Sequence, residues 1–210
     1  MRPPDPRNQQ RQIAKILAHA RRLFARHGFD RVSMDALGAA CRVTKPTIYY
    51  YFKDKRAVLL AVLKAHWTEQ AALLETFRPA ASLKETLRSL AELVLSQTQR
   101  ADTGEVIRIV LAEAGRNPDI GRAFFKVLGP AFRNVYDGPV RQHLHPRYSP
   151  PMAQALFHQY VGSLVHYSLM RQVLRASPSS LPGRGPYVDL LVDSFLRSTS
   201  PCPSRPASVR

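Results

Sequence analysis

Residues 33–56 carry hydroxyl, basic and aromatic side chains at spacings that suit contact with a nucleic acid. Two short helices are predicted there, and each begins at a hydroxyl residue, Ser33 or Thr44, that can cap the first turn. In the second helix, Ile48 and Phe52 lie four residues apart and therefore share one face. The other faces carry Lys45, Thr47, Tyr49 and Tyr50. A helix of this kind, at about residues 44–52, is typical of a helix-turn-helix that reads the major groove of DNA.

These side chains match the hydrogen-bonding edges of base pairs. Lysine can donate to O6 and N7 of guanine, and threonine or proline can contact the methyl group of thymine. Each tyrosine by itself is better explained as a half-buried aromatic, but three tyrosines at 49–51, after Thr-Lys-Pro-Thr, favour DNA binding. Asp54 can cap the next helix, which places Lys55 at its first position. A cation there opposes the helix dipole and makes sense if a phosphate lies over that terminus.

Three runs of residues, within about Ile13 to Leu63, resemble the TetR family of bacterial transcriptional regulators. The first helix of that family ends in Leu-Phe-x-x-x-Gly, and residues 23–28 read Leu-Phe-Ala-Arg-His-Gly. A Ser or Thr opens its helix-turn-helix, as Ser33 does here. Its recognition helix often reads Pro/Gly-Thr-Leu-Tyr-x-x-Phe before Lys-x-Lys, and residues 46–55 read Pro-Thr-Ile-Tyr-Tyr-Tyr-Phe-Lys-Asp-Lys.

The resemblance implies roles for eight residues. Four would read bases: Lys45, Pro46, Thr47 and Tyr49. Four would hold the phosphate backbone: Ser33, Thr44, Tyr50 and Lys55. Two positions depart from the family pattern, because Arg42 stands where the turn usually has Gly and Tyr51 where His is common. A non-glycine residue with positive φ costs about 1 kcal/mol, so the geometry of the turn is the feature that these departures affect.

The net charge agrees with a polyanion as partner. The chain has 31 Lys and Arg against 15 Asp and Glu, a formal charge of +16. Residues 1–56 contribute more than half of that charge, which is typical of a nucleic-acid surface. A generally basic proteome would explain much of the remainder. Charge alone also fits a non-specific architectural DNA-binding protein, which is the main alternative to a sequence-specific regulator.

The rest of the chain shows helical periodicity and no strand signal, which predicts an all-α fold. We expect helices at about 8–27, 55–77, 82–100, 102–115, from 118 with a break or kink at 129–130, and at 149–176 and 187–197. Asp102 and Glu105 form a weak capping box for the fourth of these. The predicted domains are a basic arm at 1–8, a three-helix helix-turn-helix domain at 9–56, a helical C-terminal domain at 57–198 joined to it by the long helix, and a disordered tail at 199–210.

No catalytic or metal-binding constellation is visible in the sequence. There is no phosphate-cradling glycine loop, no His-Glu-x-x-His, no Gly-x-Ser-x-Gly and no cysteine pair at zinc spacing. His143 and His145 are the nearest approach to a metal pair, and a solvated helix end explains them better. We therefore expect no enzymatic activity, metal or cofactor; a helical enzyme of unfamiliar type is the less favoured alternative.

The cysteines and the hydropathy pattern predict a reduced, cytoplasmic protein. Cys41 falls on an apolar helix face and Cys202 in a Pro/Ser tail, a poor pair for a disulfide. The N-terminus lacks the apolar segment of a signal peptide. Residues 148–170 carry no Asp, Glu, Lys or Arg but several Gln, His and Ser, too polar a set to span a membrane. That stretch is expected to be a helix buried against protein.

The resemblance also implies what the C-terminal domain does. It would bind a small, often hydrophobic effector and form a homodimer through its last two helices, 150–176 and 187–197. The candidate pocket residues are large aromatics: Trp67, Phe77, Phe124, Phe125 and Tyr136. Ordinary core packing is the alternative for each of them. A symmetric dimer would read a palindromic operator on double-stranded DNA, and the effector would lower its affinity by tilting the helix at 55–77. Repression is the default expectation, and activation is the alternative.

Overall fold

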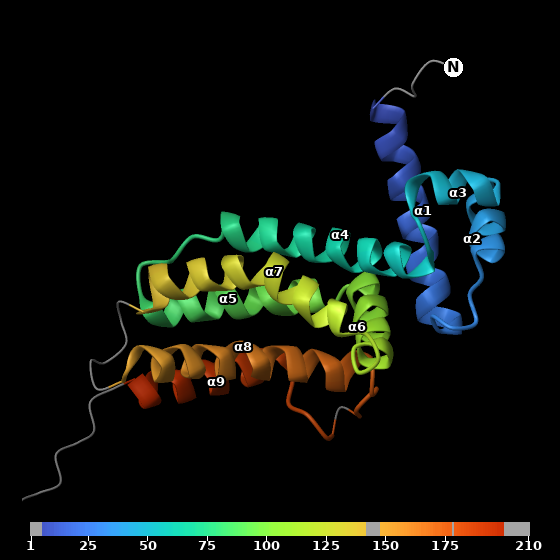
Figure 1. Ribbon diagram of the computed structural model, residues 1–210. Helices are drawn as coiled ribbons and strands as arrows, with labels where there is room; N and C mark the ends of the chain where they lie inside the picture. Colours follow the sequence, from blue (N-terminus) through green and yellow to red (C-terminus); the bar gives the residue numbers. More distant parts are fainter. Residues whose placement is uncertain (1–5, 142–147, 178, 200–210) are drawn as a thin grey trace, which may run out of the picture. The chain divides into compact units, whose positions relative to one another are not determined.

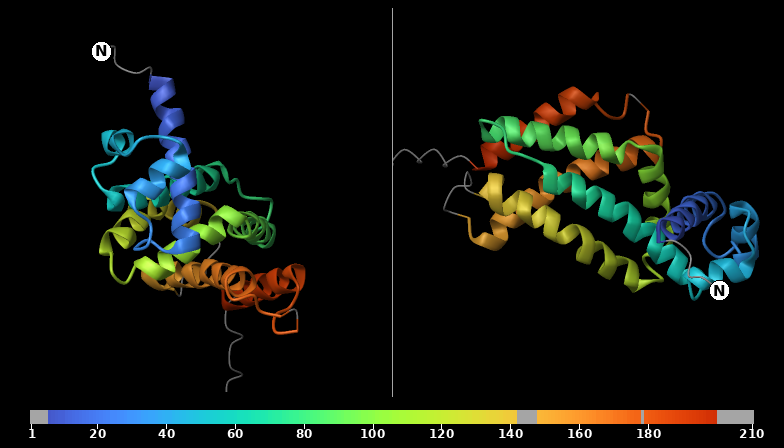
Figure 2. Two further views of the ribbon diagram at one scale, coloured as in Figure 1. Left: turned by 90° about the vertical axis from the view of Figure 1, so that its right-hand side faces the viewer. Right: turned by 90° about the horizontal axis from the view of Figure 1, so that it is seen from above.

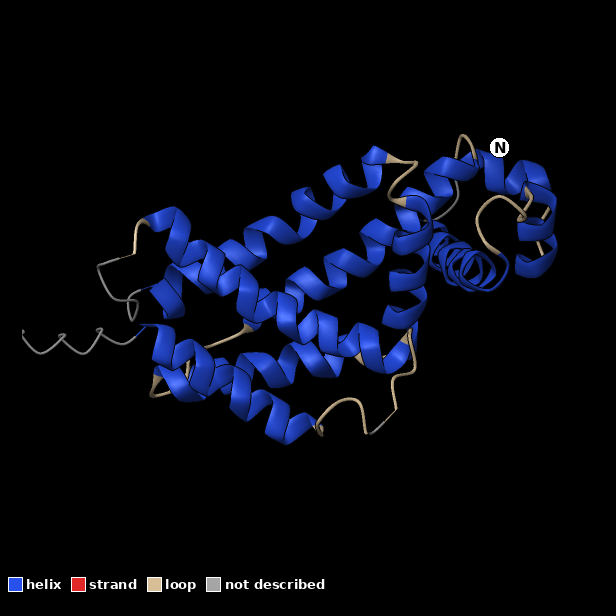
Figure 3. Ribbon diagram, turned by 90° about the horizontal axis from the view of Figure 1, so that it is seen from below, coloured by secondary structure: helices blue, strands red, loops and turns tan. Residues whose placement is uncertain are grey.

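The computed structural model describes residues 6–141, 148–177 and 179–199. Every regular element in these ranges is helical (Figures 1 and 3), so the all-α prediction is confirmed. The helices are α1 Pro6–His27, α2 Met34–Cys41, α3 Lys45–Tyr51, α4 Lys55–Thr76, α5 Leu83–Thr98, α6 Ala101–Glu113, α7 Pro118–Val135, a π-helical segment Tyr136–Val140, α8 Pro150–Gln172 and α9 Arg184–Thr199. None of these helices has both the length and the apolarity that a membrane span needs.

The chain forms two compact units. The first contains the described residues up to Leu74 and those from Gln99 to Phe132; the second contains Glu75–Thr98 and the described residues from Arg133 onward. The first unit thus includes nearly all of α4, α6 and most of α7 in addition to the helix-turn-helix segment. The predicted boundaries divide the chain by expected function, whereas the two units are divided by spatial contacts. The predicted boundaries therefore stay predictions. Most of the predicted arm and tail, and both His143 and His145, lie outside the described residues.

In the first unit, α1 supports the helix-turn-helix. It packs against α2 and α6, and α2 packs against α3. Ile16, Ala20 and Phe24 form its buried stripe at the spacing of an amphipathic helix. Gly28 follows α1 with a φ of 80°, and its N–H donates to the carbonyl of Phe24 at 2.9 Å. This left-handed glycine ends the helix where the sequence predicted its end.

In the second unit, α5 packs against α8 and α9, and α8 lies beside α9 (Figure 2). Leu87 and Leu90 of α5 and Phe157 and Leu164 of α8 are fully buried. The buried hydroxyl of Tyr160 donates to the carbonyl of Leu87 at 2.8 Å. Burial at this position raises the pKa of the Tyr160 phenol well above its usual range.

The helix does not break at residues 129–130, because α7 continues through Pro130 to Val135. The alternative, a kink at this position, stays a prediction. A proline inside a helix leaves the carbonyl four residues earlier without its backbone partner. Here Pro130 and Lys126 are both exposed, so that carbonyl lies on the solvent side of the helix. The last helix is also longer than predicted, since α9 runs from Arg184 to Thr199.

Candidate nucleic-acid interface

Both helices of the predicted helix-turn-helix begin as the sequence indicated. Ser33 has extended backbone, and its Oγ accepts the N–H of Ala36 at 3.0 Å. Thr44 also has extended backbone, and its Oγ1 lies 3.4 Å from the N of Thr47 and 2.8 Å from the hydroxyl of Thr47. These bonds satisfy N–H groups that have no partner inside the helix. Both predicted N-caps are confirmed.

The turn between α2 and α3 has the left-handed geometry that the family's usual glycine would provide. Arg42 adopts φ 54° and ψ 47°, and its N–H donates to the carbonyl of Ala39 at 3.1 Å. The N–H of Val43 donates to the carbonyl of Gly38 at 2.9 Å. The two bonds close the end of α2 in the manner of a glycine cap. Arginine therefore adopts the turn at the modest cost of a side chain in this backbone region.

Gly38 is a structural determinant of the turn that sequence reasoning missed. A Cβ added there would lie 2.9 Å from the carbonyl oxygen of Val43, closer than real Cβ atoms approach a backbone atom. The glycine is buried, and the chain after α2 folds back directly over it. Because the contact joins residues of the turn itself, a larger side chain would displace α3 from α2.

Replacing Gly38 with valine is expected to lower the free energy of unfolding by about 1–3 kcal/mol, the usual cost of overpacking. Alanine should also destabilise the fold, because its Cβ alone would lie 2.9 Å from the backbone oxygen of Val43. Gly121→Val in α7 is the matched control, because nothing lies within 4 Å of a Cβ added there. Urea unfolding of the three variants would measure the differences. Equal stability of Gly38→Val and Gly121→Val would contradict the close approach.

The recognition helix α3 separates a buried face from an exposed one. Ile48 is fully buried and Phe52 nearly so, as the spacing of four predicted. Tyr49 is 46% exposed and Tyr50 66% exposed, although both are large aromatic residues. The remaining predicted contact residues of this helix are exposed, apart from the half-buried Thr47: Thr44, Lys45 and Pro46. The surface therefore offers hydroxyl, ammonium and aromatic groups side by side.

One carboxylate lies within this basic surface. The ammonium of Lys45 donates to Oδ2 of Asp35 at 2.8 Å, which joins the start of α3 to the start of α2. This hydrogen bond raises the pKa of Lys45, so the ammonium stays charged. Asp35 also lies in the first turn of α2, where the positive end of the helix dipole favours a carboxylate.

Lys55 lies at the first position of α4, as predicted, but its ammonium is engaged within the protein. It donates to the carbonyls of Phe29 at 2.8 Å and Asp30 at 3.2 Å, and it lies 4.4 Å from the centre of the Phe29 ring. Asp54 caps the helix, with Oδ1 accepting the N–H of Ala57 at 2.7 Å. Lys55 thus ties the start of α4 to the loop after α1, and its role as a phosphate contact stays a prediction.

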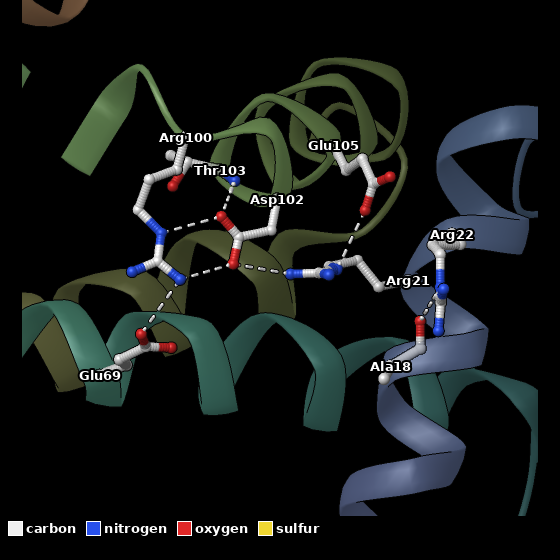
Figure 4. Close-up of polar contacts among 8 residues, drawn as sticks. All are labelled: Ala18, Arg21, Arg22, Glu69, Arg100, Asp102, Thr103 and Glu105. Atoms are coloured by element: carbon white, nitrogen blue, oxygen red, sulfur yellow. Dashed lines mark hydrogen bonds and ion pairs between the residues drawn. The ribbon is translucent and has the colours of Figure 1, made fainter. Parts of the chain in front are cut away.

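An ionic cluster joins α1, α4 and α6, and we call its five residues the Asp102 junction (Figure 4). Asp102 accepts two hydrogen bonds from the guanidinium of Arg100, at 3.1 and 3.0 Å, and lies 3.0 Å from the guanidinium of Arg21. Arg21 of α1 also pairs with Glu105 of α6 at 3.0 Å, and Arg100 pairs with Glu69 of α4 at 3.4 Å.

The predicted capping box at Asp102 and Glu105 is therefore wrong. The helix begins at Ala101, and Arg100 stands at the N-cap position without a side-chain cap. Both carboxylates bind arginines that approach from elsewhere in the chain, which a local capping pattern does not reveal.

The neighbouring charges in the Asp102 junction favour the ionised form of Asp102. The guanidinium of Arg100, assisted by that of Arg21, holds the pKa of Asp102 far below its usual range, although partial burial opposes this. Nearby in α4, burial lowers the pKa of His66, and this outweighs the attraction of Asp102 and Glu69 for its proton. A neutral buried histidine makes the fold less stable as the pH falls below the ordinary pKa of 6.5, because the unfolded chain takes up the proton more readily.

The predicted effector residues fall into different environments. In the first unit, Trp67 of α4 is buried and meets the edge of the Phe124 ring of α7 at 5.3 Å. Phe125, which follows Phe124, is 73% exposed. Phe77, which belongs to the second unit, is half-buried just after α4. In the second unit, Tyr136 is buried against Phe157, with ring centroids 5.7 Å apart. The hydroxyl of Tyr136 has no hydrogen-bond partner among the described residues.

Comparison with known proteins places this geometry among bacterial regulators. The family described as bacterial regulatory proteins of the tetR family matches residues 16–62, which include α2 and α3. An HTH-type transcriptional regulator of Mycobacterium bovis is 34% identical over 124 residues, which cover 56% of this chain and 55% of that protein. The chain thus spans about half the length of the curated relatives it matches.

Solved structures share the arrangement of helices. A TetR-family regulator from Mesorhizobium loti has a TM-score of 0.71 and 20% identity, covering 90% of this chain and 96% of its own. FadR from Bacillus subtilis, solved in complex with stearoyl-CoA, has a TM-score of 0.68 and 17% identity, covering 85% and 97%. At these identities the solved structures show the fold alone.

Proposed function

We propose that this chain, whose residues 16–62 match the tetR family of bacterial regulatory proteins, is a repressor that binds a palindromic operator as a homodimer and is released by a small effector. The exposed face of α3 carries this proposal. Lys45, Pro46, Thr47 and Tyr49 are assigned to base edges, and Ser33, Thr44, Tyr50 and Lys55 to the phosphate backbone. A two-fold dimer would present two α3 helices to the major groove about 34–36 Å apart, or a multiple of that distance.

The outward face of α8 supports the homodimer. Met152, His158 and Val165 are exposed, and Gly162 lies at the centre of the same face. No Asp, Glu, Lys or Arg occurs between residues 148 and 170, although an exposed helix face normally carries charges. A groove of about 90 Å³ between α8 and α9, lined in part by Gln159 and Leu191, adjoins this face and could receive a partner side chain. A glycine at the centre would let two α8 helices approach closely.

The aromatic clusters support a small, predominantly hydrophobic effector. In the first unit, Trp67 and Phe124 link α4 to α7 through their rings. In the second unit, Tyr136 separately offers a buried hydroxyl to a polar ligand group. The structure of FadR from Bacillus subtilis in complex with stearoyl-CoA, a ligand with a long apolar part, supports an effector of this kind. Because α4 begins at the Lys55 contact with the helix-turn-helix, an effector that shifts Trp67 would move α4 against that segment. Only an effector with unequal affinity for the two states can do so.

A non-specific architectural DNA-binding protein is the second candidate, because the formal charge of +16 would support it. The two functions differ in sequence preference. Selection of bound duplexes from a random pool, by the purified protein at physiological salt, separates them. Enrichment of one palindrome is the expected result. Retention without enrichment, with steep salt dependence, would overturn the regulator proposal in favour of the second candidate.

Replacing Tyr49 with alanine is expected to weaken binding to the selected operator by about 10–100-fold, the loss of about 1–3 kcal/mol of base contact. Because Tyr49 is 46% exposed and lies outside the buried face of α3, the temperature of thermal unfolding should change little. Lys45→Ala, one turn earlier on α3, should act in the same way. Fluorescence anisotropy with labelled operator measures both. If both variants bound like the parent, the assigned face of α3 would be wrong.

A further inference from the structure

Asp35 is the one carboxylate among described residues 6–56 that lies against a proposed base-reading side chain. Of the other acids in this range, Asp30 pairs with Arg116 at 3.2 Å, and Asp54 caps α4. Asp35 is 67% exposed at its side chain and bonds the ammonium of Lys45 at 2.8 Å. A negative charge within a surface that must approach phosphates lowers the affinity for any DNA. A carboxylate at this position therefore needs a function that offsets this loss of affinity.

Stability does not provide that role. An ion pair with both partners this exposed contributes about 0–1 kcal/mol. The first turn of α2 is already capped by Ser33, whose Oγ accepts the N–H of Ala36. What the contact does change is the freedom of Lys45, because lysine has a flexible four-carbon stem and an ammonium with three rotatable donors. One donor held by Asp35 leaves two for an acceptor in front of α3.

We propose that Asp35 is a specificity-determining residue that positions Lys45. Its carboxylate holds the ammonium where the two remaining N–H groups meet O6 and N7 of a guanine, and it repels phosphates that would otherwise pair with the same ammonium. Asp35 thereby lowers affinity for DNA in general and raises the ratio of operator to non-operator binding. This inference rests on the proposed function, since it assumes that Lys45 reads a base.

The chemistry of the two acceptors explains why positioning yields discrimination. A guanine presents two acceptors in fixed geometry at the major-groove edge, whereas phosphate oxygens surround the backbone and accept a donor from many directions. A freely moving lysine gains about as much from phosphate as from guanine, so it binds all sequences. A lysine whose ammonium is held at one place binds most favourably when a guanine lies opposite it.

The test compares Asp35→Asn, Lys45→Ala and the double variant with the parent. Each is titrated with the operator selected by the parent, with a scrambled duplex, and with operators altered at single guanine positions. Asp35→Asn is expected to bind scrambled DNA several-fold more tightly and to lose about tenfold in the operator-to-scrambled ratio. It should also tolerate substitution of one guanine per half-site. In the Lys45→Ala background, Asp35→Asn should not change the ratio further.

Two controls separate positioning from charge and from folding. Asp30→Asn removes one negative charge from residues 6–56, as Asp35→Asn does. It should raise the affinity for the operator and for the scrambled duplex by the same factor. Asp35→Glu keeps the carboxylate on a longer stem and should recover part of the ratio. The proposal is overturned if Asp35→Asn and Asp30→Asn behave alike, or if the Asp35→Asn effect persists without Lys45. Failure of the proposed function looks different, because the parent itself would then show no preference for any duplex.

Discussion

Replacing Gly162 with glutamate is expected to convert the proposed dimer to a monomer and to weaken operator binding by about 100-fold or more, the gain that two linked sites provide. Nothing in the protomer lies within 4 Å of a Cβ added at Gly162. The substitution should therefore leave the protomer intact, and it removes a glycine from the interior of α8, which favours the helix by about 0.5–1 kcal/mol. The substitution would instead disrupt the contact between two copies. In an isologous interface both copies contribute the same residue, so two charged side chains would be placed in one interface.

Gly129→Glu in α7 is the matched control. It makes the same change in a helix, again with nothing within 4 Å of the added Cβ. Sedimentation velocity at micromolar concentration should show a dimer for the parent and for Gly129→Glu, and a monomer for Gly162→Glu. Gly162→Ala should form a dimer that dissociates more readily than the parent dimer, because a methyl group separates the two α8 helices only slightly. A dimeric Gly162→Glu would show that copies associate through another surface.

Replacing Asp102 with asparagine is expected to lower the free energy of unfolding by about 1.5–3 kcal/mol, the range measured for hydrogen bonds to charged groups. The carboxylate accepts from both Arg100 and Arg21 and carries only 20% exposure of its side chain, so it is better shielded than an ordinary surface pair. Without its charge, two guanidinium groups would face each other across α1 and α6. Urea unfolding at pH 7 measures this loss.

The stability lost in Asp102→Asn should become smaller in acid. The arginines lower the pKa of Asp102 in the folded chain, so the carboxylate contributes its full stabilisation above its ordinary pKa of 3.8. That contribution disappears progressively as the pH falls below 3.8 toward the lowered value. The difference in stability between the parent and Asp102→Asn should therefore be constant from pH 7 to pH 5 and narrow at pH 3.5. A difference that grew in acid would contradict the assignment.

Asp119→Asn is the matched control for Asp102→Asn. Asp119 also lies in the first turn of its helix and pairs with two arginines, Arg122 of the same helix and Arg56 of α4, but its side chain is 41% exposed. Its replacement should cost less than about 1 kcal/mol. Because Arg21 belongs to α1, Asp102→Asn should also weaken operator binding while the protein remains folded, and Asp119→Asn should not. Equal effects of the two variants would mean that the Asp102 junction is an ordinary surface cluster.

The local features of the reading helices were predictable from the sequence. The caps at Ser33 and Thr44 join residues three apart, and the buried pair Ile48 and Phe52 follows from helical spacing alone. Gly28 ends α1 because only glycine adopts a positive φ there without strain. Each of these depends on backbone geometry within one or two turns, so residue type and spacing determine it.

The tertiary contacts were not predictable in the same way. Asp102 and Glu105 read as a local capping box, whereas Arg21 reaches them from a helix far earlier in the chain. Lys55 read as a phosphate ligand, whereas its ammonium also binds the carbonyls after α1. Phe125 and Tyr136 were equal candidates for a pocket, yet one is exposed and the other is buried. Sequence spacing contains no information on which distant segment will supply the partner.

By itself, the sequence determined an all-helical chain with a capped helix-turn-helix and an exposed set of polar and aromatic side chains on its second helix. These properties depend on hydrogen bonds and hydrophobic periodicity within a few residues. The tertiary structure alone decided that Asp35 bonds Lys45, that Gly38 lies under the turn, and that three helices meet at Asp102. Such contacts depend on the packing of whole helices, because a side chain's charge and type do not specify which neighbour the fold brings within bonding distance.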